Sequence, residues 1–260
     1  MPEILEIEYY RLGAVPALRR TVESVGADDA WYLKRDTSAA ELDAALVGER
    51  FVDARRHGKV LLLDVSSGVT AGLRFGMTGR LIVDDDAPIR ELEYSSARDD
   101  PAWDRFVVHF ADGGSLRMRD PRRLGGVELD PDIARLGPDA WELTAVELEA
   151  ATAGSSVAIK ARLLDQNRVA GLGNLLVDET LWRAGIAPGR SADDLTRSEI
   201  DTLATTVRST IADLFARGGS HRGDLHDERA VDGRCPLDGA ALRRDTIGGR
   251  TSYWCPQHQR

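Results

Sequence analysis

The first residues of the sequence suit nucleophilic chemistry. Pro2 follows Met1, and Glu3 and Glu6 come next, one helical turn apart. Removal of Met1 would leave Pro2 with a secondary α-amine. Terminal amines titrate near ~8, against ~10.4 for lysine, so much more of the amine is uncharged at neutral pH. Such an amine can attack a sugar carbon and form an iminium, with the two carboxyls as acid and charge stabiliser. A helix beginning at Pro2 accounts for the same residues, because proline and acids both suit a first turn.

Lysine is rare in this chain. Lys34, Lys59 and Lys160 are the only lysines among 34 basic residues. A lysine retained against this bias can do what arginine cannot, because its ammonium is able to give up a proton. Chance survival is the alternative for each of the three.

Residues 159–179 predict a short helix, a turn and a second helix. Gly171 and Gly173 lie in the turn, and Asn174 is a favoured N-cap for a helix over 175–184 that ends at Gly185. A helix start with free N–H groups is suited to bind one phosphate, and Lys160 could reach a second. An ordinary helical hairpin explains the pattern equally well.

Apolar and alternating runs at 51–65, 69–83, 105–110 and 115–129 predict antiparallel strands of a sandwich or barrel. Two turns in this region carry side chains that could fill the hole left by an extruded base: Met77 in one, Arg122 and Leu124 in the other. From the turns alone, solvated turns with core anchors are the better explanation. The acidic residues 84–104 predict a solvent-facing loop.

The C-terminal tail has the spacing of a structural zinc ribbon. Cys235 and Asp238 form one knuckle, and Cys255 and His258 form the other after sixteen residues. Histidine is an ordinary zinc ligand, whereas aspartate is a harder and less usual one. A metal-free β-hairpin is the alternative. Gly248 and Gly249 mark the hairpin turn, which places Arg250 where it could reach a phosphate.

Composition and charge bound the function. The chain has 260 residues, two cysteines and a net charge of -9, of which residues 1–150 carry -10 and residues 151–260 carry +1. A nucleic-acid face must therefore be local. No apolar run has the length of a membrane span, and no signal peptide is evident, so we expect a cytoplasmic monomer without membrane contact.

The domain organisation follows from these elements. We expect a catalytic β-sandwich flanked by helices over 1–130 and a linker over 131–143. Helices over 144–218 follow, the first and last opened by capping boxes at Thr144 and Thr196. Residues 219–260 complete the chain with a zinc-ribbon-like finger. The fold class is α+β with several domains.

The ordered motifs together resemble the formamidopyrimidine-DNA glycosylase / endonuclease VIII family of bifunctional DNA repair enzymes. The resemblance covers most of the chain and rests on these stretches: Pro2-Glu3 with Glu6, 56–59, 76–79, 120–123, 163–174 and the tail. The helix–two-turn–helix stretch is the most specific of them.

The resemblance implies a role for each site residue. Pro2 would be the Schiff-base nucleophile, Glu3 the acid, Glu6 a charge stabiliser, and Lys59 a group on the phosphate side that helps elimination. Damaged double-stranded DNA would be the partner and one structural zinc ion the cofactor. The remaining residues would bind the DNA: Arg250, Lys160 and Asn174 at phosphates, and Met77, Arg122 and Leu124 in the duplex void.

The sequence departs from the family at three places. Leu5 stands where the family usually has proline, Leu124 where it usually has phenylalanine, and two zinc positions are not cysteine. We expect a glycosylase that removes oxidised or ring-opened bases and cleaves the abasic site by β/δ-elimination. Purine and pyrimidine lesions both stay compatible with residues 220–232. A catalytically silent damaged-DNA-binding protein is the alternative, and an RNA-binding helical hairpin a weaker one.

Overall fold

A computed structural model describes residues 2–89, 92 and 98–260. The chain divides into two compact units. The first comprises Pro2 and Glu6–Ile133, and the second comprises Glu3–Leu5 and Ala134–Arg260. Helix α1 (Ile4–Gly13) therefore gives its first two residues to the second unit and the rest to the first. Each unit is described by itself below.

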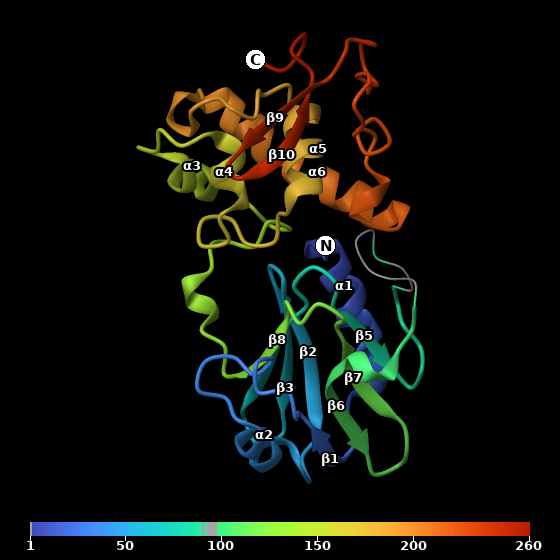
Figure 1. Cartoon of the computed structure of the whole chain (residues 1–260). Coiled ribbons are helices and arrows are strands. Elements are labelled where there is room, and N and C mark those ends of the chain that lie inside the picture. The colour runs from blue at the N-terminus through green and yellow to red at the C-terminus, as the bar shows by residue number, and fades with distance from the viewer. Residues whose placement is uncertain (1, 90–91, 93–97) are drawn as a thin grey trace. The chain divides into compact units, whose positions relative to one another are not determined.

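The first unit contains two four-stranded antiparallel sheets, with strand orders β1-β6-β7-β5 and β2-β3-β4-β8 (Figure 1). The strands are β1 (Val22–Gly26), β2 (Phe51–His57), β3 (Val60–Val65), β4 (Thr70–Arg74), β5 (Arg80–Val83), β6 (Asp104–Phe110), β7 (Ser115–Arg119) and β8 (Gly126–Leu129). Helix α2 (Ala39–Leu46) and the 3-10 turns η1 (Val15–Ala17), η2 (Pro101–Trp103) and η3 (Ile133–Arg135) complete it.

Both sheets share one hydrophobic core, which makes this unit a β-sandwich. Leu61 and Leu73 from one sheet pack in the same buried cluster as Phe106 and Met118 from the other. Tyr10 of α1 joins them. Alternating residues of the strands thus meet between the layers, as the apolar runs predicted.

Two predicted runs cross from one sheet to the other. The run 69–83 forms β4 in one sheet and β5 in the other, and the run 115–129 likewise divides into β7 and β8. The turns that carry Met77 and Leu124 make these crossings. Strand β1 and helix α2 lie in a stretch for which the sequence predicted no defined element. The predicted loop over 84–104 falls partly outside the described residues.

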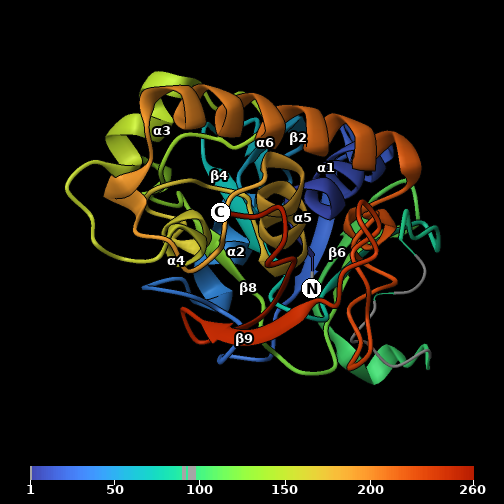
Figure 2. The ribbon, with the colours of Figure 1, turned by 90° about the horizontal axis from the view of Figure 1, so that it is seen from above.

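The second unit is helical, with a β-hairpin at its end. Its elements are α3 (Ala145–Thr152), α4 (Ile159–Leu164), α5 (Asn174–Ala184), η4 (Ala192–Asp194), α6 (Arg197–Arg217), η5 (Ser220–Arg222), β9 (Arg243–Ile247) and β10 (Arg250–Trp254). Helix α5 packs against α6 (Figure 2). It also packs against β10 of the hairpin. Ile4 and Leu5 are buried in the core that the helices share.

The predicted capping residues at the helix ends of this unit are confirmed, except for Asn174. Thr144 and Thr196 each accept a hydrogen bond from the backbone of a glutamate three residues later, and that glutamate bonds back. Gly185 and Gly218 end α5 and α6 in the left-handed conformation. No helix among the described residues has the length and apolar character needed to cross a bilayer.

Two helix starts differ from the prediction. Helix α1 begins at Ile4 and not at Pro2. Helix α5 begins at Asn174 with Gly173 as its N-cap, so Asn174 is the first helical residue and not the cap. The side chain of Asn174 instead contacts the hairpin.

Candidate active site and nucleic-acid interface

The start of α5 binds an anion, and that anion is the carboxylate of Glu3. Its oxygens accept hydrogen bonds from the backbone N–H groups of Gly173 (2.8 Å), Leu175 (2.9 Å) and Leu176 (3.2 Å). The free N–H groups of a helix start favour a negative charge. The sequence predicted a phosphate at this place; in the folded protein Glu3 occupies it.

Close packing explains the two glycines of this turn. A Cβ atom on Gly173 would lie 2.3 Å from Cδ of Glu3, and one on Gly171 would lie 2.6 Å from Cδ1 of Ile4. Gly171 also has a φ of +115°, and its carbonyl accepts the N–H of Ile4 at 3.0 Å. The glycines therefore let the first residues of the chain lie directly on the helical hairpin.

Pro2 and Glu6 are both buried, Glu6 with 5 % of its surface exposed. Met1, whose removal would free the Pro2 amine, lies outside the described residues. Glu6 is on α1 in the first unit. Burial raises the pKa of Tyr10, and the charge of Glu6 raises it further. The Tyr10 hydroxyl donates a hydrogen bond to the Gly79 carbonyl at 3.1 Å.

Lys59 occupies the tight turn between β2 and β3. His57 pairs with Val60, so Gly58 and Lys59 form a two-residue hairpin loop, and Gly58 has the positive φ of +53° that such a loop requires. Lys59 is half-buried. The hairpin fixes the backbone from which its ammonium extends.

Asp120 joins the two turns of the first unit that were expected to enter the duplex. Its carboxylate accepts from the Thr78 hydroxyl (2.6 Å) and the Gly125 N–H (2.8 Å). A Cβ on Gly76 would lie 2.4 Å from the Leu124 carbonyl carbon, so the turns touch through their backbones. Their side chains remain accessible: Leu124 is 48 % exposed, Arg122 is exposed and Met77 is half-buried. The structure thus brings together the two turns that carry Met77, Arg122 and Leu124.

Lys160 is buried in the second unit, with none of its surface exposed. Its ammonium donates to Oδ1 of Asp178 at 2.6 Å and to the Thr251 carbonyl at 3.0 Å. Burial lowers the pKa of Lys160, and the Asp178 carboxylate opposes that shift. Both of these hydrogen bonds join the Lys160 ammonium to groups of the protein itself, so a contact between Lys160 and a phosphate stays a prediction.

The finger hairpin, formed by β9 and β10, is held on α5 through the same Thr251 carbonyl. The amide of Asn174 donates to the Thr251 carbonyl at 3.1 Å, and its own carbonyl oxygen Oδ1 is buried without a partner among the described residues. Gly248 and Gly249 both have positive φ, which identifies the turn predicted before Arg250. Arg250 is exposed at the first position of β10.

The four tail residues converge as their spacing predicted. One ligand atom from each of them lies within 4.8 Å of all the others, and both cysteines are buried. His258 Nδ1 is 3.2 Å from Oδ2 of Asp238 and 3.6 Å from Sγ of Cys235. Hydrogen bonds, the strongest from the Ala240 N–H, lower the pKa of Asp238 to about 2, whereas burial raises the pKa of the Cys255 thiol. The residues can hold a metal ion.

The sequence did not predict the roles of two carboxylates, each of which connects separate segments of the chain. Asp120 lies in the 120–123 stretch, and its residue type alone predicted no role for it. Asp178 accepts from Lys160, from an Arg229 guanidinium N–H and from the Tyr253 N–H at 3.3 Å, and so joins three separate segments. Its partners are dispersed along the chain, and no local pattern connects them.

Comparison with known proteins places this architecture in a class of DNA repair enzymes. Residues 1–127 match the formamidopyrimidine-DNA glycosylase N-terminal domain, and residues 136–223 match the H2TH domain of the same family. The chain is 34% identical to the formamidopyrimidine-DNA glycosylase of Halorhodospira halophila and 35% identical to that of Stenotrophomonas maltophilia, in both cases over 100% of both chains.

Solved structures agree with this assignment. The fold is similar to that of Lactococcus lactis Fpg in complex with abasic-site DNA, with a TM-score of 0.80 and 25% identity over 99% of both chains. A complex of the same protein with a THF-DNA and an inhibitor gives a TM-score of 0.82 at 25% identity over the full length of both chains. The chain belongs to the formamidopyrimidine-DNA glycosylase family, which consists of bifunctional glycosylases and AP lyases.

Proposed function

We propose that this protein removes oxidised or ring-opened bases from double-stranded DNA and then cleaves the abasic site through a Schiff base on Pro2. The observation that carries the proposal is the anchoring of Glu3. Three backbone N–H groups hold the residue next to Pro2 on α5, so a processed chain end would have one defined position. A rigid support of this kind is what a nucleophile needs.

The chemistry follows from an uncharged Pro2 nitrogen. Its lone pair forms a bond to C1′ while the base departs with the glycosidic electron pair and takes up a proton from an acid. The C1′–O4′ bond then breaks, O4′ takes up the proton that the Pro2 nitrogen loses, and the opened sugar is held as an iminium. Loss of the C2′ proton then expels the 3′ phosphate, and a second elimination expels the 5′ phosphate. Glu3 is proposed as the acid, Glu6 as the charge stabiliser, and Lys59 as the group that assists elimination.

The hydrogen bonds of Glu3 place a condition on its role. Three N–H donors favour the ionised carboxylate. To act as an acid toward the substrate, Glu3 must first take up a proton, which these three donors oppose. In the free protein its role is to position the chain end.

The remaining residues are proposed to hold the DNA. Arg250 would bind phosphates from its exposed position after the finger turn, with Lys160 and Asn174 supporting that turn through the Thr251 carbonyl. Extrusion of a nucleotide leaves a hole in the base stack that must be filled. The adjacent turns of the first unit present an accessible methionine, arginine and leucine for this purpose: Met77, Arg122 and Leu124.

We also propose that the tail cluster binds one structural zinc ion. Two sulfurs, an imidazole nitrogen and a carboxylate oxygen form a four-coordinate donor set that zinc accepts. Cys235, Asp238, Cys255 and His258 would hold the ion and thereby the finger. Metal analysis of the purified chain should give about one zinc per chain. A content far below this would reject the metal site without affecting the catalytic proposal.

Borohydride trapping tests the nucleophile. Duplex DNA with an abasic site or an oxidised base should form a covalent complex with the chain that begins at Pro2. A matched chain that keeps additional residues before Pro2 should bind the same DNA without being trapped, because its Pro2 nitrogen is an amide. Pro2→Gly provides a second comparison. Failure of the processed chain to trap on any substrate of a lesion panel would overturn the proposal.

The burial of Pro2 favours a second candidate function. A chain end that stays buried could not reach a sugar, and the protein would then be a silent binder of damaged DNA. The same experiment separates the two, since a silent binder shows salt-sensitive binding without trapping or strand cleavage. In either case we expect a monomer that acts in the cytoplasm.

A further inference from the structure

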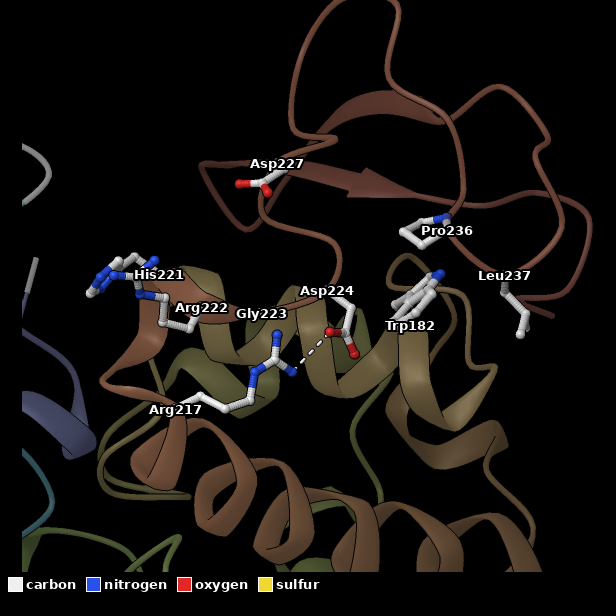
Figure 3. A pocket seen from close by; sticks show the side chains of 9 residues that line it. All are labelled: Trp182, Arg217, His221, Arg222, Gly223, Asp224, Asp227, Pro236 and Leu237. Carbon is white, nitrogen blue, oxygen red and sulfur yellow. Dashed lines mark hydrogen bonds and ion pairs between the residues drawn. The ribbon is translucent and has the colours of Figure 1, made fainter.

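One residue of α5 contacts a metal-ligating residue from each knuckle of the finger. Trp182 is 8 % exposed, and its indole Nε1–H donates to Sγ of Cys235 at 3.3 Å. Its backbone carbonyl lies 3.2 Å from Nε2 of His258. Figure 3 shows its side chain on the wall of a pocket of about 580 Å³, close to Pro236, the residue after Cys235.

The carbonyl contact determines which nitrogen of His258 is available to a metal. A carbonyl oxygen can only accept a hydrogen bond, so Nε2 must carry the proton. In the neutral imidazole, which is the form that binds a metal, the lone pair is then on Nδ1, the nitrogen directed at Asp238 and Cys235. The geometry therefore selects the histidine tautomer that can complete the cluster.

The indole contact acts on the other knuckle. A metal-bound cysteine sulfur carries negative charge, and an N–H donor aimed at it forms a charge-assisted hydrogen bond. This bond orients the Cys235 sulfur before the ion arrives. The ring of Trp182 also meets the ring of His258 edge-on, at 6.0 Å between centroids and 74° between planes. The indole thus restricts the rotation of both ligands.

We propose that Trp182 is the positioning residue of the metal site and that it couples the occupancy of that site to the end of α5. The inference rests on the proposed zinc site and extends it. The two knuckles contact each other through Asp238, whose Oδ2 lies 3.2 Å from Nδ1 of His258 and 3.3 Å from Sγ of Cys255, but each knuckle is a short turn. The helix provides the fixed reference that both knuckles share, through one donor and one acceptor of the same residue.

Trp182→Phe tests the role of the indole N–H in the full chain. Phenylalanine preserves an aromatic side chain but has no donor for the Cys235 sulfur. We expect at least about a 10-fold loss of zinc affinity, measured by competition with a chromophoric chelator. Trp141→Phe is the matched control, because Trp141 packs on Phe215 in the same unit and should leave the affinity unchanged. Equal affinities in both variants would overturn the proposal.

A spectroscopic measurement on the unmutated chain applies even if Trp182→Phe folds poorly. In protein labelled with ¹⁵N-tryptophan, chelation of the zinc should shift the Trp182 indole N–H resonance and leave those of Trp31, Trp103 and Trp141 in place. A Trp182 resonance that does not move on zinc removal would contradict the coupling. A chain that never binds zinc would overturn the metal site and this inference together, whereas zinc bound without either effect would overturn the inference alone.

Discussion

Glu3 contacts a helix that lies 170 residues further along the chain. Its carboxylate performs the capping that a local side chain usually provides at a helix start, since Gly173 has no side chain to offer. One residue therefore satisfies three backbone donors and fixes the beginning of the chain. This dual use makes Glu3 important for folding as well as for the proposed chemistry.

Glu3→Gln should destabilise the protein measurably. The glutamine amide keeps the shape of the side chain but loses the charge. Its NH2 group cannot accept a hydrogen bond, so it leaves at least one backbone N–H group of the helix start without an acceptor. We expect a loss of about 1–3 kcal/mol in the free energy of unfolding, measured by urea denaturation. Glu23→Gln, at an exposed position of β1, should change it by less than about 0.5 kcal/mol. Similar values for both variants would show that the cap contributes nothing.

At the scale of elements, the crossings between the two sheets carry the side chains that we propose to enter the duplex. The turn after β4 and the turn after β7 both pass from one sheet to the other, and Asp120 connects them. A side chain at such a crossing is supported by the whole sandwich. The same packing leaves no room beside Gly76, whose φ is +58°.

Gly76→Ala should separate the two turns. The added Cβ meets the Leu124 backbone at 2.4 Å, in addition to the strain of a positive φ. Gly68→Ala isolates the strain, because Gly68 has a φ of +93° with nothing within 4 Å of the added atom. We expect Gly76→Ala to cost about 1–3 kcal/mol more than Gly68→Ala in unfolding free energy. It should also weaken binding to abasic-site duplex, which is measured by fluorescence anisotropy.

Equal stability and equal binding of these two glycine variants would mean that the turns can move apart freely. In that case Met77 and Leu124 would not act as one wedge, and the proposal for filling the duplex void would lose its structural support.

At the scale of the whole molecule, a net charge of -9 opposes binding to DNA. Affinity must therefore come from locally placed cations, and binding should weaken as the salt concentration rises. The first 150 residues carry most of the excess negative charge, while the remaining residues are close to neutral. Selectivity for damaged sites is favoured when non-specific attraction is weak.

Arg250→Ala should reduce the slope of log K against log salt concentration by about 1, as expected for the loss of one phosphate contact. Arg217→Ala is the matched control, because that guanidinium is paired with Asp213 and Asp224 inside the second unit. Binding isotherms for an abasic-site duplex at several salt concentrations provide the measurement. An unchanged slope for Arg250→Ala would remove this residue from the proposed interface.

Short-range patterns were sufficient for much of this protein. The capping boxes at Thr144 and Thr196, the glycine turn before Arg250 and the convergence of the four tail residues all depend on residues near one another in sequence or on fixed motif spacing. Hydrogen bonds across three or four residues follow directly from residue type, so these features were predicted with their residue numbers.

Tertiary packing decided the rest. Three features depend on segments that lie far apart in the chain. They are the division of two strand runs between the sheets, the contact of Glu3 with the start of α5, and the burial of Lys160 beside Asp178. Sequence alone named the residues of the candidate site and the family, because types and spacing are local properties. Which charges face each other inside the protein is set by burial, since a buried charge must find its partner wherever the fold supplies one.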